Sequence, residues 1–252
     1  MKRPPFTITD KIANFIAQIS EQIGKIQASG EYERNLQLRK ANRLRSIQAS
    51  TAIEGNTLSL EQVGDIIDGK NIIASPREIE EVKNAYTAYQ NALEFNPFSE
   101  TDFLKAHNLM TAGLVKEAGV YRASDVGVFD GTKIVHLGAR PQYIAGLVKD
   151  LFEWAEKSDA HPLIKSSIVH FEIEFIHPFS DGNGRMGRLW QALILSKWRA
   201  IFAWLPIETI IYENQIDYYD VLGRAEKTAD STEFIEFMLS YIKESASQKN
   251  YR

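Results

Sequence analysis

Apolar residues recur along most of the chain at the three- and four-residue spacing of an amphipathic helix. Near the N-terminus this spacing joins Ile12, Phe15, Ile16, Ile19, Ile23 and Ile26. Similar spacing predicts helices that contain residues 86–93, 104–110, 147–154 and 234–241. Because residues three and four apart share one face of a helix, these segments can each bury one side in a common core. The pattern therefore predicts a mainly α protein.

Three segments also contain the residue types that begin a helix. The run Ser59–Gln62 has the spacing of a capping box, in which a hydroxyl and an amide side chain bond each other's backbone. The run Ser75–Glu78 repeats that spacing and adds Pro76, which suits the first helical position. We therefore expect helices to begin after Ser59, after Ser75 and after Ser99.

One region departs from the helical pattern. Residues 126–129 and 134–137 are short and rich in β-branched types, and Asp130-Gly131 between them is a favoured pair for a type I′ hairpin turn. A short hairpin is only marginally stable by itself. It is therefore expected either as a surface loop packed on the helices or as a functional flap.

Composition excludes several classes of protein. The 252 residues include 29 Lys plus Arg and 33 Asp plus Glu, a net charge of −4, which argues against broad nucleic-acid binding. The absence of Cys excludes disulfides, thiolate metal sites and a Cys nucleophile. The most apolar run, residues 201–207, is far shorter than the ~20 residues that span a bilayer, and no signal-peptide core follows Lys2-Arg3. We expect no nucleic-acid or membrane partner, and a cytoplasmic location or export without a visible signal.

Residues 177–188 concentrate the reactive side chains. Gly182 and Gly184 permit backbone torsions that turn successive N–H groups inward as an anion nest. A helix beginning near Gly184 or Arg185 would add its N-terminal amides and positive dipole end. Arg185 and Arg188 would share one face of that helix and reach phosphate oxygens. The segment therefore predicts a phosphate-binding loop.

Two further residues make this loop a candidate catalytic site. Asp181 is suited to hold Mg²⁺ together with phosphates, and His177 is the natural general base. One alternative is a dinucleotide fingerprint, Gly182-x-Gly184-x-x-Gly187, but no strand immediately precedes it and no βαβ pattern surrounds it. A second alternative is a plain loop between two core helices, which accounts for the glycines but not for the histidine and arginines.

The run His177-Pro-Phe-Ser-Asp-Gly-Asn-Gly-Arg-Met-Gly-Arg188 resembles the signature of Fic domains, His-x-Phe-x-Asp/Glu-Gly-Asn-Gly-Arg-x-x-Arg, at every specified position. The resemblance covers about residues 75–200. It implies a Fic-type helical bundle with the motif loop between two central helices and a β-hairpin flap above it. The implied parts are an N-terminal helical extension over 1–70 with an inhibitory helix, a core over 71–205 with the flap at about 119–140, and closing helices over 206–252.

Most Fic enzymes transfer AMP from ATP to a Ser, Thr or Tyr hydroxyl, so the resemblance implies a protein adenylyltransferase. By position in the motif, His177 would take the hydroxyl proton, Asp181 would hold Mg²⁺, and Phe179 would anchor the loop. The remaining motif residues would bind phosphates: Gly182, Asn183 and Gly184 in the anion hole, Arg185 at the β-phosphate and Arg188 at the γ-phosphate. Kinase-type relatives have Lys at the position of Gly184, so this sequence favours nucleotidyl transfer.

The resemblance also implies partners. In the family the flap aligns a segment of the target protein by strand addition, for which the candidate residues here are Val126, Val128, Ile134 and Val135. Members of the family often dimerise, so a second copy of the chain is another candidate partner. His136 lies on the same hairpin and is a weaker candidate for contact with nucleotide or target.

Residues 50–56 suggest an internal inhibitor. Ser50 and Glu54 share a helix face, and Gly55 suits the position just after a helix end. Glu54 would then oppose the helix dipole, which indicates a cationic partner elsewhere. The segment resembles the inhibitory motif of Fic proteins, Ser/Thr-x-x-x-Glu-Gly/Asn, which implies that Glu54 engages Arg188 and keeps it from the γ-phosphate. The class implied is the one with an N-terminal inhibitory helix.

Two other functions remain open at this stage. The same site could remove AMP from a modified target, with Glu54 positioning a water, or the chain could be an ATP-binding module without turnover. Histidines and tryptophans outside these segments are expected to have structural positions only. His107 and His161 are expected at the surface or at helix caps, His170 in a packed position, and Trp190, Trp198 and Trp204 in the core.

Overall fold

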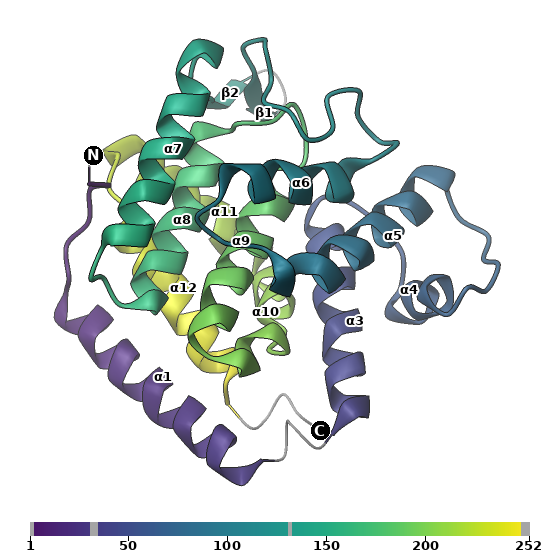
Figure 1. Ribbon diagram of the computed structural model, residues 1–252, viewed down its shortest axis with the longest axis horizontal. Helices are drawn as coiled ribbons and strands as arrows, with labels where there is room; N and C mark the ends of the chain where they lie inside the picture. The colour runs from purple at the N-terminus through teal and green to yellow at the C-terminus, as the bar shows by residue number, and fades with distance from the viewer. Residues whose placement is uncertain (1–2, 31–34, 131–132, 248–252) are drawn as a thin grey trace.

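The computed structural model describes residues 3–30, 35–130 and 133–247, and in this part the chain is helical apart from one hairpin (Figure 1). The elements in chain order are α1 (Asp10–Ser29), α3 (Leu36–Ile53), α4 (Leu60–Ile67), α5 (Pro76–Asn91), the 3₁₀ turn η1 (Ala92–Glu94), α6 (Glu100–Thr111), β1 (Gly127–Asp130), β2 (Lys133–Leu137), α7 (Pro141–Lys157), α8 (Pro162–Ile176), α9 (Asn183–Trp198), the 3₁₀ turn η2 (Ala200–Ala203), α10 (Ile207–Glu213), α11 (Gln215–Thr228) and α12 (Thr232–Ser245). The mainly α prediction is confirmed.

Helices α8 and α9 form the centre of the bundle. Helix α8 is apolar on nearly every side, with Ile164, Ile168 and Phe171 all buried, as expected for a helix surrounded by others. Helices α7 and α12 pack on α8, while α6 and α3 contact α9. Figure 1 shows α1 along one side, against α12, and α4 with α5 on the opposite side. The loop that joins the two central helices therefore lies at one end of a rigid pair.

All three predicted helix starts are confirmed, but the side-chain cap expected at Ser75 is wrong. Ser59 forms the expected capping box, and the Ser99 hydroxyl accepts a hydrogen bond from Asp102 N at 3.2 Å. Pro76 does occupy the first turn of α5, but the Ser75 side chain makes no capping hydrogen bond. The Glu78 carboxylate accepts bonds from Thr57 N (2.9 Å) and Thr57 Oγ1 (2.7 Å). Glu78 thus interacts both with the local backbone at Ser75 and with a partner 21 residues away.

Strands β1 and β2 pair antiparallel, with Gly127 opposite Leu137 and an irregularity between Val128 and Phe129. The turn position Gly131 lies outside the described residues. Figure 1 shows the strands at the end of the bundle where α7 begins. This is also the end at which α8 reaches the motif loop, because Ala139 N donates to Ile176 O at 3.1 Å.

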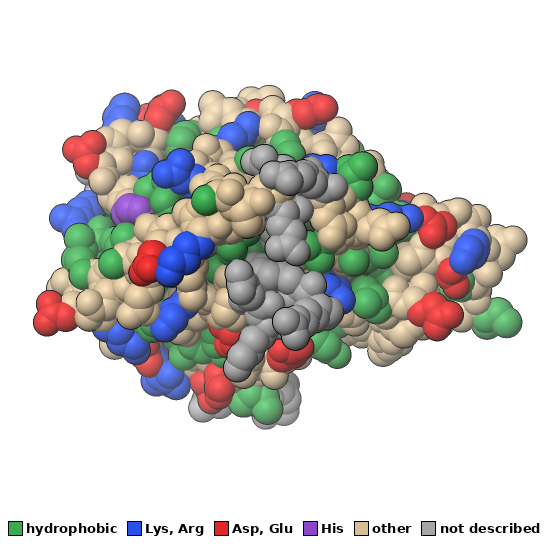
Figure 2. All heavy atoms as spheres, turned by 90° about the horizontal axis from the view of Figure 1, so that it is seen from below, with side chains coloured by type: hydrophobic (Ala, Val, Ile, Leu, Met, Phe, Trp, Pro, Cys, Tyr) green, Lys and Arg blue, Asp and Glu red, His purple; other side chains and the backbone are tan. Residues whose placement is uncertain are grey.

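The surface is mixed in charge. Figure 2 shows Lys and Arg side chains interspersed with Asp and Glu on the face viewed from below. Among the described helices, none is both long enough and apolar enough to cross a bilayer. Trp190 lies in the core as predicted, whereas Trp198 and Trp204 are only half-buried at its edge. The prediction for these two tryptophans was therefore wrong.

Candidate active site

His177 ends helix α8 with a left-handed backbone conformation, φ 51°. Residues other than glycine seldom adopt this conformation, and such strain is concentrated at functional sites. The His177 Nδ1 atom lies 3.4 Å from the carbonyl oxygen of Glu174. A proton on Nδ1 is satisfied by that carbonyl, which leaves Nε2 as the basic nitrogen.

The loop after His177 is held in shape by Asn183. Its Oδ1 accepts a hydrogen bond from Phe179 N and its Nδ2 donates to Phe179 O, each at 2.9 Å. The Phe179 ring is fully buried and stacks on the His107 ring with centroids 3.6 Å apart. Phe179 therefore occupies the anchoring position expected of it, and the Asn183 side chain shapes the loop.

His107 is completely buried beneath the loop, so its prediction as a surface or cap residue was wrong. Its Nδ1 accepts a hydrogen bond from Gly119 N (2.9 Å), so Nε2 carries the proton and donates to Asp181 O (3.0 Å). Burial lowers the pKa of His107 to about 4, and the ring stays neutral near pH 7. His107 thus fixes the backbone at Asp181.

The other two histidines agree with the sequence. His161 caps α8 by accepting from Leu163 N at 3.2 Å. His170 is packed in the core, where it contacts Gln191 Oε1 (2.7 Å) and Tyr218 Oη (3.0 Å). Neither lies in the motif loop.

The start of α9 offers unpaired backbone amides to an anion. Gly182 precedes the helix with φ 85°, a conformation that favours glycine. The helix starts at Asn183, and its first backbone bond runs from Met186 N to Gly182 O at 3.0 Å. The amides of Asn183, Gly184 and Arg185 therefore precede the hydrogen-bond ladder, at the positive end of the helix dipole. The turn has the form expected of an anion nest, and the helix starts one residue earlier than the sequence predicts.

Asp181 lies at the edge of this nest, with its side chain 36% exposed. Its Oδ1 accepts hydrogen bonds from Gly182 N (2.6 Å) and Arg185 Nη2 (3.1 Å). Its Oδ2 lies 3.3 Å from Nη2 of Arg77, which comes from α5. No pattern in the sequence marks Arg77, because 104 residues separate it from Asp181.

Arg188 is buried and is held by the end of α3. Its Nη2 lies 2.6 Å from Glu54 Oε1 and 3.0 Å from Ser50 O, and its Nε lies 3.3 Å from Ser50 Oγ. Helix α3 ends here, with Glu54 at its C-cap and Gly55 in the left-handed region at φ 91°. The segment 50–56 and Arg188, which the family resemblance connects, are therefore in direct contact.

Two carboxyl groups lie near Arg188, those of Glu54 and Glu174, and they affect its charge differently. Burial alone would lower the pKa of Arg188, but the Glu54 carboxylate, together with Tyr218 and Tyr219, outweighs burial and the pKa is raised. Burial raises the pKa of the neighbouring Glu174 to about 8, although Arg188 opposes that shift. Glu174 is therefore mainly protonated at neutral pH, and Glu54 is the carboxylate that neutralises Arg188. Arg188 Nη1 is buried without a hydrogen-bond partner, beside Gly184.

Gly187 lets α8 and α9 approach closely. A Cβ atom there would lie 2.6 Å from Cδ2 of the buried His170 ring, whereas the space beside Gly146 on α7 is empty. We expect Gly187→Ala to lower the free energy of unfolding by about 1–3 kcal/mol, because a packed ring must move. Gly146→Ala should raise it by about 0.5–1 kcal/mol. Urea denaturation measures both, and equal changes would contradict this packing.

Arg122 ties the hairpin to the motif loop. Its side chain is buried and donates Nε to His177 O (2.7 Å), Nη1 to Ser124 O (2.7 Å) and Nη2 to Ala139 O. Its own N–H bonds Pro178 O at 3.1 Å. The sequence did not indicate this residue, since an isolated arginine before a hairpin belongs to no periodic pattern. Both ends of the hairpin are thus fixed next to His177.

Of the four predicted docking residues, the structure describes the side chain of one, Val126. Val126 is half-buried at the base of the hairpin, and its carbonyl accepts from Gly138 N at 3.2 Å. Val128, Ile134 and Val135 belong to the paired strands, but their side chains lie outside the described part of the structure, as does that of His136.

The surroundings exclude a dinucleotide fingerprint. Gly182 follows helix α8 and a loop instead of a strand, and the only sheet in the described residues is the antiparallel hairpin. The described residues also contain no group of three or more His, Asp or Glu that could bind a metal by themselves. Asp181 alone still fits Mg²⁺, because this ion takes one or two carboxylates and completes its shell with phosphates and water.

Comparisons with known proteins agree with this geometry. Residues 97–195 match the Fic/DOC family. The crystal structure of a Fic family protein from Desulfovibrio desulfuricans G20 superposes with a TM-score of 0.94 at 48% identity, over 97% of this chain and 75% of that one. The chain belongs to the Fic family. Its helical bundle is therefore that of a Fic protein.

Curated Fic relatives are named for their activity. Protein adenylyltransferase Fic of Nematostella vectensis is 28% identical over 207 residues, which is 76% of this chain and 45% of the relative. Protein adenylyltransferase fic-1 of Caenorhabditis elegans is 30% identical over 204 residues, 76% of this chain and 38% of the relative. The chain thus spans less than half the length of these two relatives.

Proposed function

We propose that this Fic protein is a protein adenylyltransferase, which transfers AMP from ATP to a hydroxyl group of a target protein. The observation that carries the proposal is the motif loop, where a strained histidine, unpaired helix amides, a carboxylate and two buried arginines converge. The names of its curated relatives support the same activity. Phosphate transfer depends mainly on positioning and charge stabilisation, and these groups supply both.

His177 acts as the general base. Its Nδ1 faces the Glu174 carbonyl, so Nε2 accepts the proton of the target hydroxyl. The hydroxyl oxygen forms a bond to the α-phosphorus while the bond to the bridging oxygen of pyrophosphate breaks. Pyrophosphate leaves, and the target retains AMP as a phosphodiester.

The phosphates bind at the start of α9. The amides of Asn183, Gly184 and Arg185 point to the anion, and the Arg185 guanidinium lies at the same edge. Arg188, once released from Glu54, contacts the γ-phosphate with its fork of donors, including the Nη1 that is now unpaired. When bound, Mg²⁺ would neutralise phosphate charge, and Asp181 is the residue that would hold it.

The hairpin docks the target. Strands β1 and β2 have outer edges whose backbone groups can pair with an extended segment of another protein. Arg122 and the backbone bond from Ala139 to Ile176 hold the base of the hairpin beside His177. A segment added to the hairpin would therefore present its hydroxyl to the catalytic base.

Glu54 inhibits the transfer. It occupies Arg188 Nη2 at 2.6 Å, and Ser50 occupies Nε, so the guanidinium is not available to the γ-phosphate. The Glu54 carboxylate also repels that phosphate. ATP bound without this contact would have its α-phosphate out of line with the hydroxyl. Helix α3 is thus an inhibitory helix within the same chain.

The type of transfer is tested with ATP labelled at either the α- or the γ-phosphate. We expect Glu54→Gly protein with Mg²⁺ to retain the α-label covalently and to retain none of the γ-label. Gel electrophoresis with autoradiography measures both. Covalent γ-label would show phosphoryl transfer and would overturn the assignment.

A second candidate function is removal of AMP from a modified target. It is favoured by the position of Glu54, whose side chain remains 30% exposed beside the motif and can reach a water. The two functions predict opposite effects of Glu54→Gly. The substitution should increase transfer but abolish removal, which can be followed as loss of α-label from purified, self-modified protein.

A further inference from the structure

A cavity lies away from the motif, at the end of α3 opposite Glu54. It has a volume of about 350 Å³ and opens between α3, α4, α5 and the residue that follows η2, Trp204. Its wall includes Arg39, Arg43, Tyr86 and Leu93. Arg39 precedes Glu54 by 15 residues, or about 22 Å of helix at 1.5 Å per residue. The cavity is therefore separate from the candidate active site.

Two arginines share one indole ring in this cavity. The guanidinium carbons of Arg39 and Arg43 lie 5.1 and 4.9 Å from the centroid of Trp204. The two residues are one helical turn apart, so their like charges face the same space. The Nε atoms of both are buried without a hydrogen-bond partner. Trp204 therefore holds two positive charges close together.

Among the described residues, these two arginines form no ion pair with a carboxylate, although the charge of Glu208 in an adjoining cavity attracts Arg43. Lys40, also in the wall, pairs with Asp68 at 2.9 Å, but within residues 35–130 and 133–247 no carboxylate lies within ion-pair distance of Arg39 or Arg43. The first turn of α3, capped by Asn35, contains no acidic residue. The positive end of the helix dipole thus adds to the arginines instead of being offset. This combination favours an anionic occupant.

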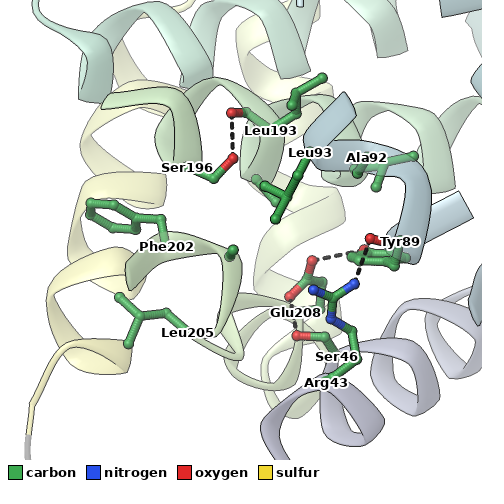
Figure 3. Close-up of a pocket in the computed structure, with 13 residues that line it drawn as sticks. Arg43, Ser46, Tyr89, Ala92, Leu93, Leu193, Ser196, Phe202, Leu205 and Glu208 are labelled. Atoms are coloured by element: carbon green, nitrogen blue, oxygen red, sulfur yellow. Dashed lines mark hydrogen bonds between the residues drawn. The ribbon is translucent and has the colours of Figure 1, made fainter. Parts of the chain in front are cut away.

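The buried carboxylate of Glu208, next to Arg43, already accepts hydrogen bonds from other side chains. Figure 3 shows an adjoining inner cavity, lined by Arg43 and Leu93, in which Glu208 accepts hydrogen bonds from Tyr89 Oη and Ser46 Oγ, both at 2.8 Å. Burial raises the pKa of Glu208. Arg43 points its Nη1 to the carbonyl of Tyr89, so it is fixed in position. The outer cavity therefore has a rigid cationic side.

The rest of the wall is apolar, with Leu36, Leu44, Ile67 and Leu93 around the ring of Tyr86. The volume lies at the small end of the 300–1,000 Å³ typical of ligand pockets. We propose that this cavity binds a small amphiphilic organic anion. A carboxylate or phosphate group bonds the Arg39 and Arg43 guanidinium groups, and an apolar body packs on the leucines and Tyr86.

Isothermal titration calorimetry with 2-naphthoate tests the proposal on the full chain. We expect saturable binding that weakens about tenfold or more in Arg39→Gln, as for loss of one charge-assisted contact. Arg45→Gln is the matched control, because Arg45 lies on the same helix but bonds Asn42 instead of lining the cavity. It should leave the affinity unchanged. If Arg39→Gln does not fold, Arg39→Lys, which keeps the charge but loses the fork, should weaken binding less but measurably.

One further variant and two control ligands distinguish binding in this cavity from binding at other anion sites. Binding should survive Arg188→Gln, which removes an arginine of the motif loop, and should exceed that of neutral 2-naphthamide and of inorganic phosphate. The proposal is overturned if 2-naphthoate does not bind at millimolar concentration, or if Arg39→Gln binds as wild type does. It is equally overturned if Arg188→Gln abolishes binding, or if the amide or inorganic phosphate binds as tightly.

Discussion

Glu54→Gly is expected to raise the initial rate of AMP transfer at least about tenfold over wild type. The substitution removes the carboxylate 2.6 Å from Arg188 Nη2 and frees the guanidinium for the γ-phosphate. A charge-assisted hydrogen bond contributes about 1.5–3 kcal/mol, and each 1.4 kcal/mol is a factor of ten. The rate is measured as α-labelled AMP incorporated into the protein per minute.

The matched control is Glu213→Gly. Glu213 likewise lies at a helix end, as the last residue of α10, and it is exposed and forms no ion pair in the described residues. It should leave the transfer rate at the wild-type value. Glu54→Gln, which keeps the shape but removes the charge, should give an intermediate rate. A rate in Glu54→Gly no higher than in wild type, with the protein folded, would contradict the inhibitory role of Glu54.

His177→Ala in the Glu54→Gly background is expected to reduce transfer by about 10²–10⁴-fold, the usual contribution of a general base. The imidazole lies at the start of the loop and is oriented by a neighbouring carbonyl, that of Glu174. The Asn183 clamp and the amides of α9 remain, so ATP affinity should change less than threefold. Label incorporation and ATP calorimetry separate these two effects.

The control for this variant is His161→Ala, which removes a histidine at the opposite end of α8. It should weaken the helix cap but retain transfer. If His177→Ala retained transfer close to that of its parent, His177 would not be the base. If it lost ATP binding as well as transfer, its role would be structural.

The sequence predicted the part of the site that lies within one continuous run. The spacing from His177 to Arg188 specifies the loop, the helix that follows it and the two arginines, because all of these are local along the chain. The segment from Ser50 to Gly55 could also be interpreted, since a carboxylate at a helix C-terminus requires a cation. Its contact with Arg188 spans 134 residues and became predictable only through the family resemblance.

The parts that the sequence did not predict depend on tertiary contacts. His107 is buried under Asp181, Arg77 reaches the same aspartate from α5, and Arg122 binds the His177 carbonyl. Each contact joins residues 55 to 104 positions apart, a range at which helical periodicity carries no information. For the same reason the sequence did not predict the bonds from Thr57 to Glu78 at the expected box. Local sequence patterns predict helices and strands, whereas the residues that hold the site in position are determined by tertiary packing.

We propose that the motif loop transfers AMP and that Glu54 restrains the transfer. The most direct measurement incubates wild type, Glu54→Gly and Glu54→Gly with His177→Ala in α-labelled ATP and Mg²⁺, and counts the label bound covalently to each protein. We expect strong label on Glu54→Gly, little on wild type and little on the double variant. Equal label on wild type and Glu54→Gly, or undiminished label on the double variant, would contradict this proposal.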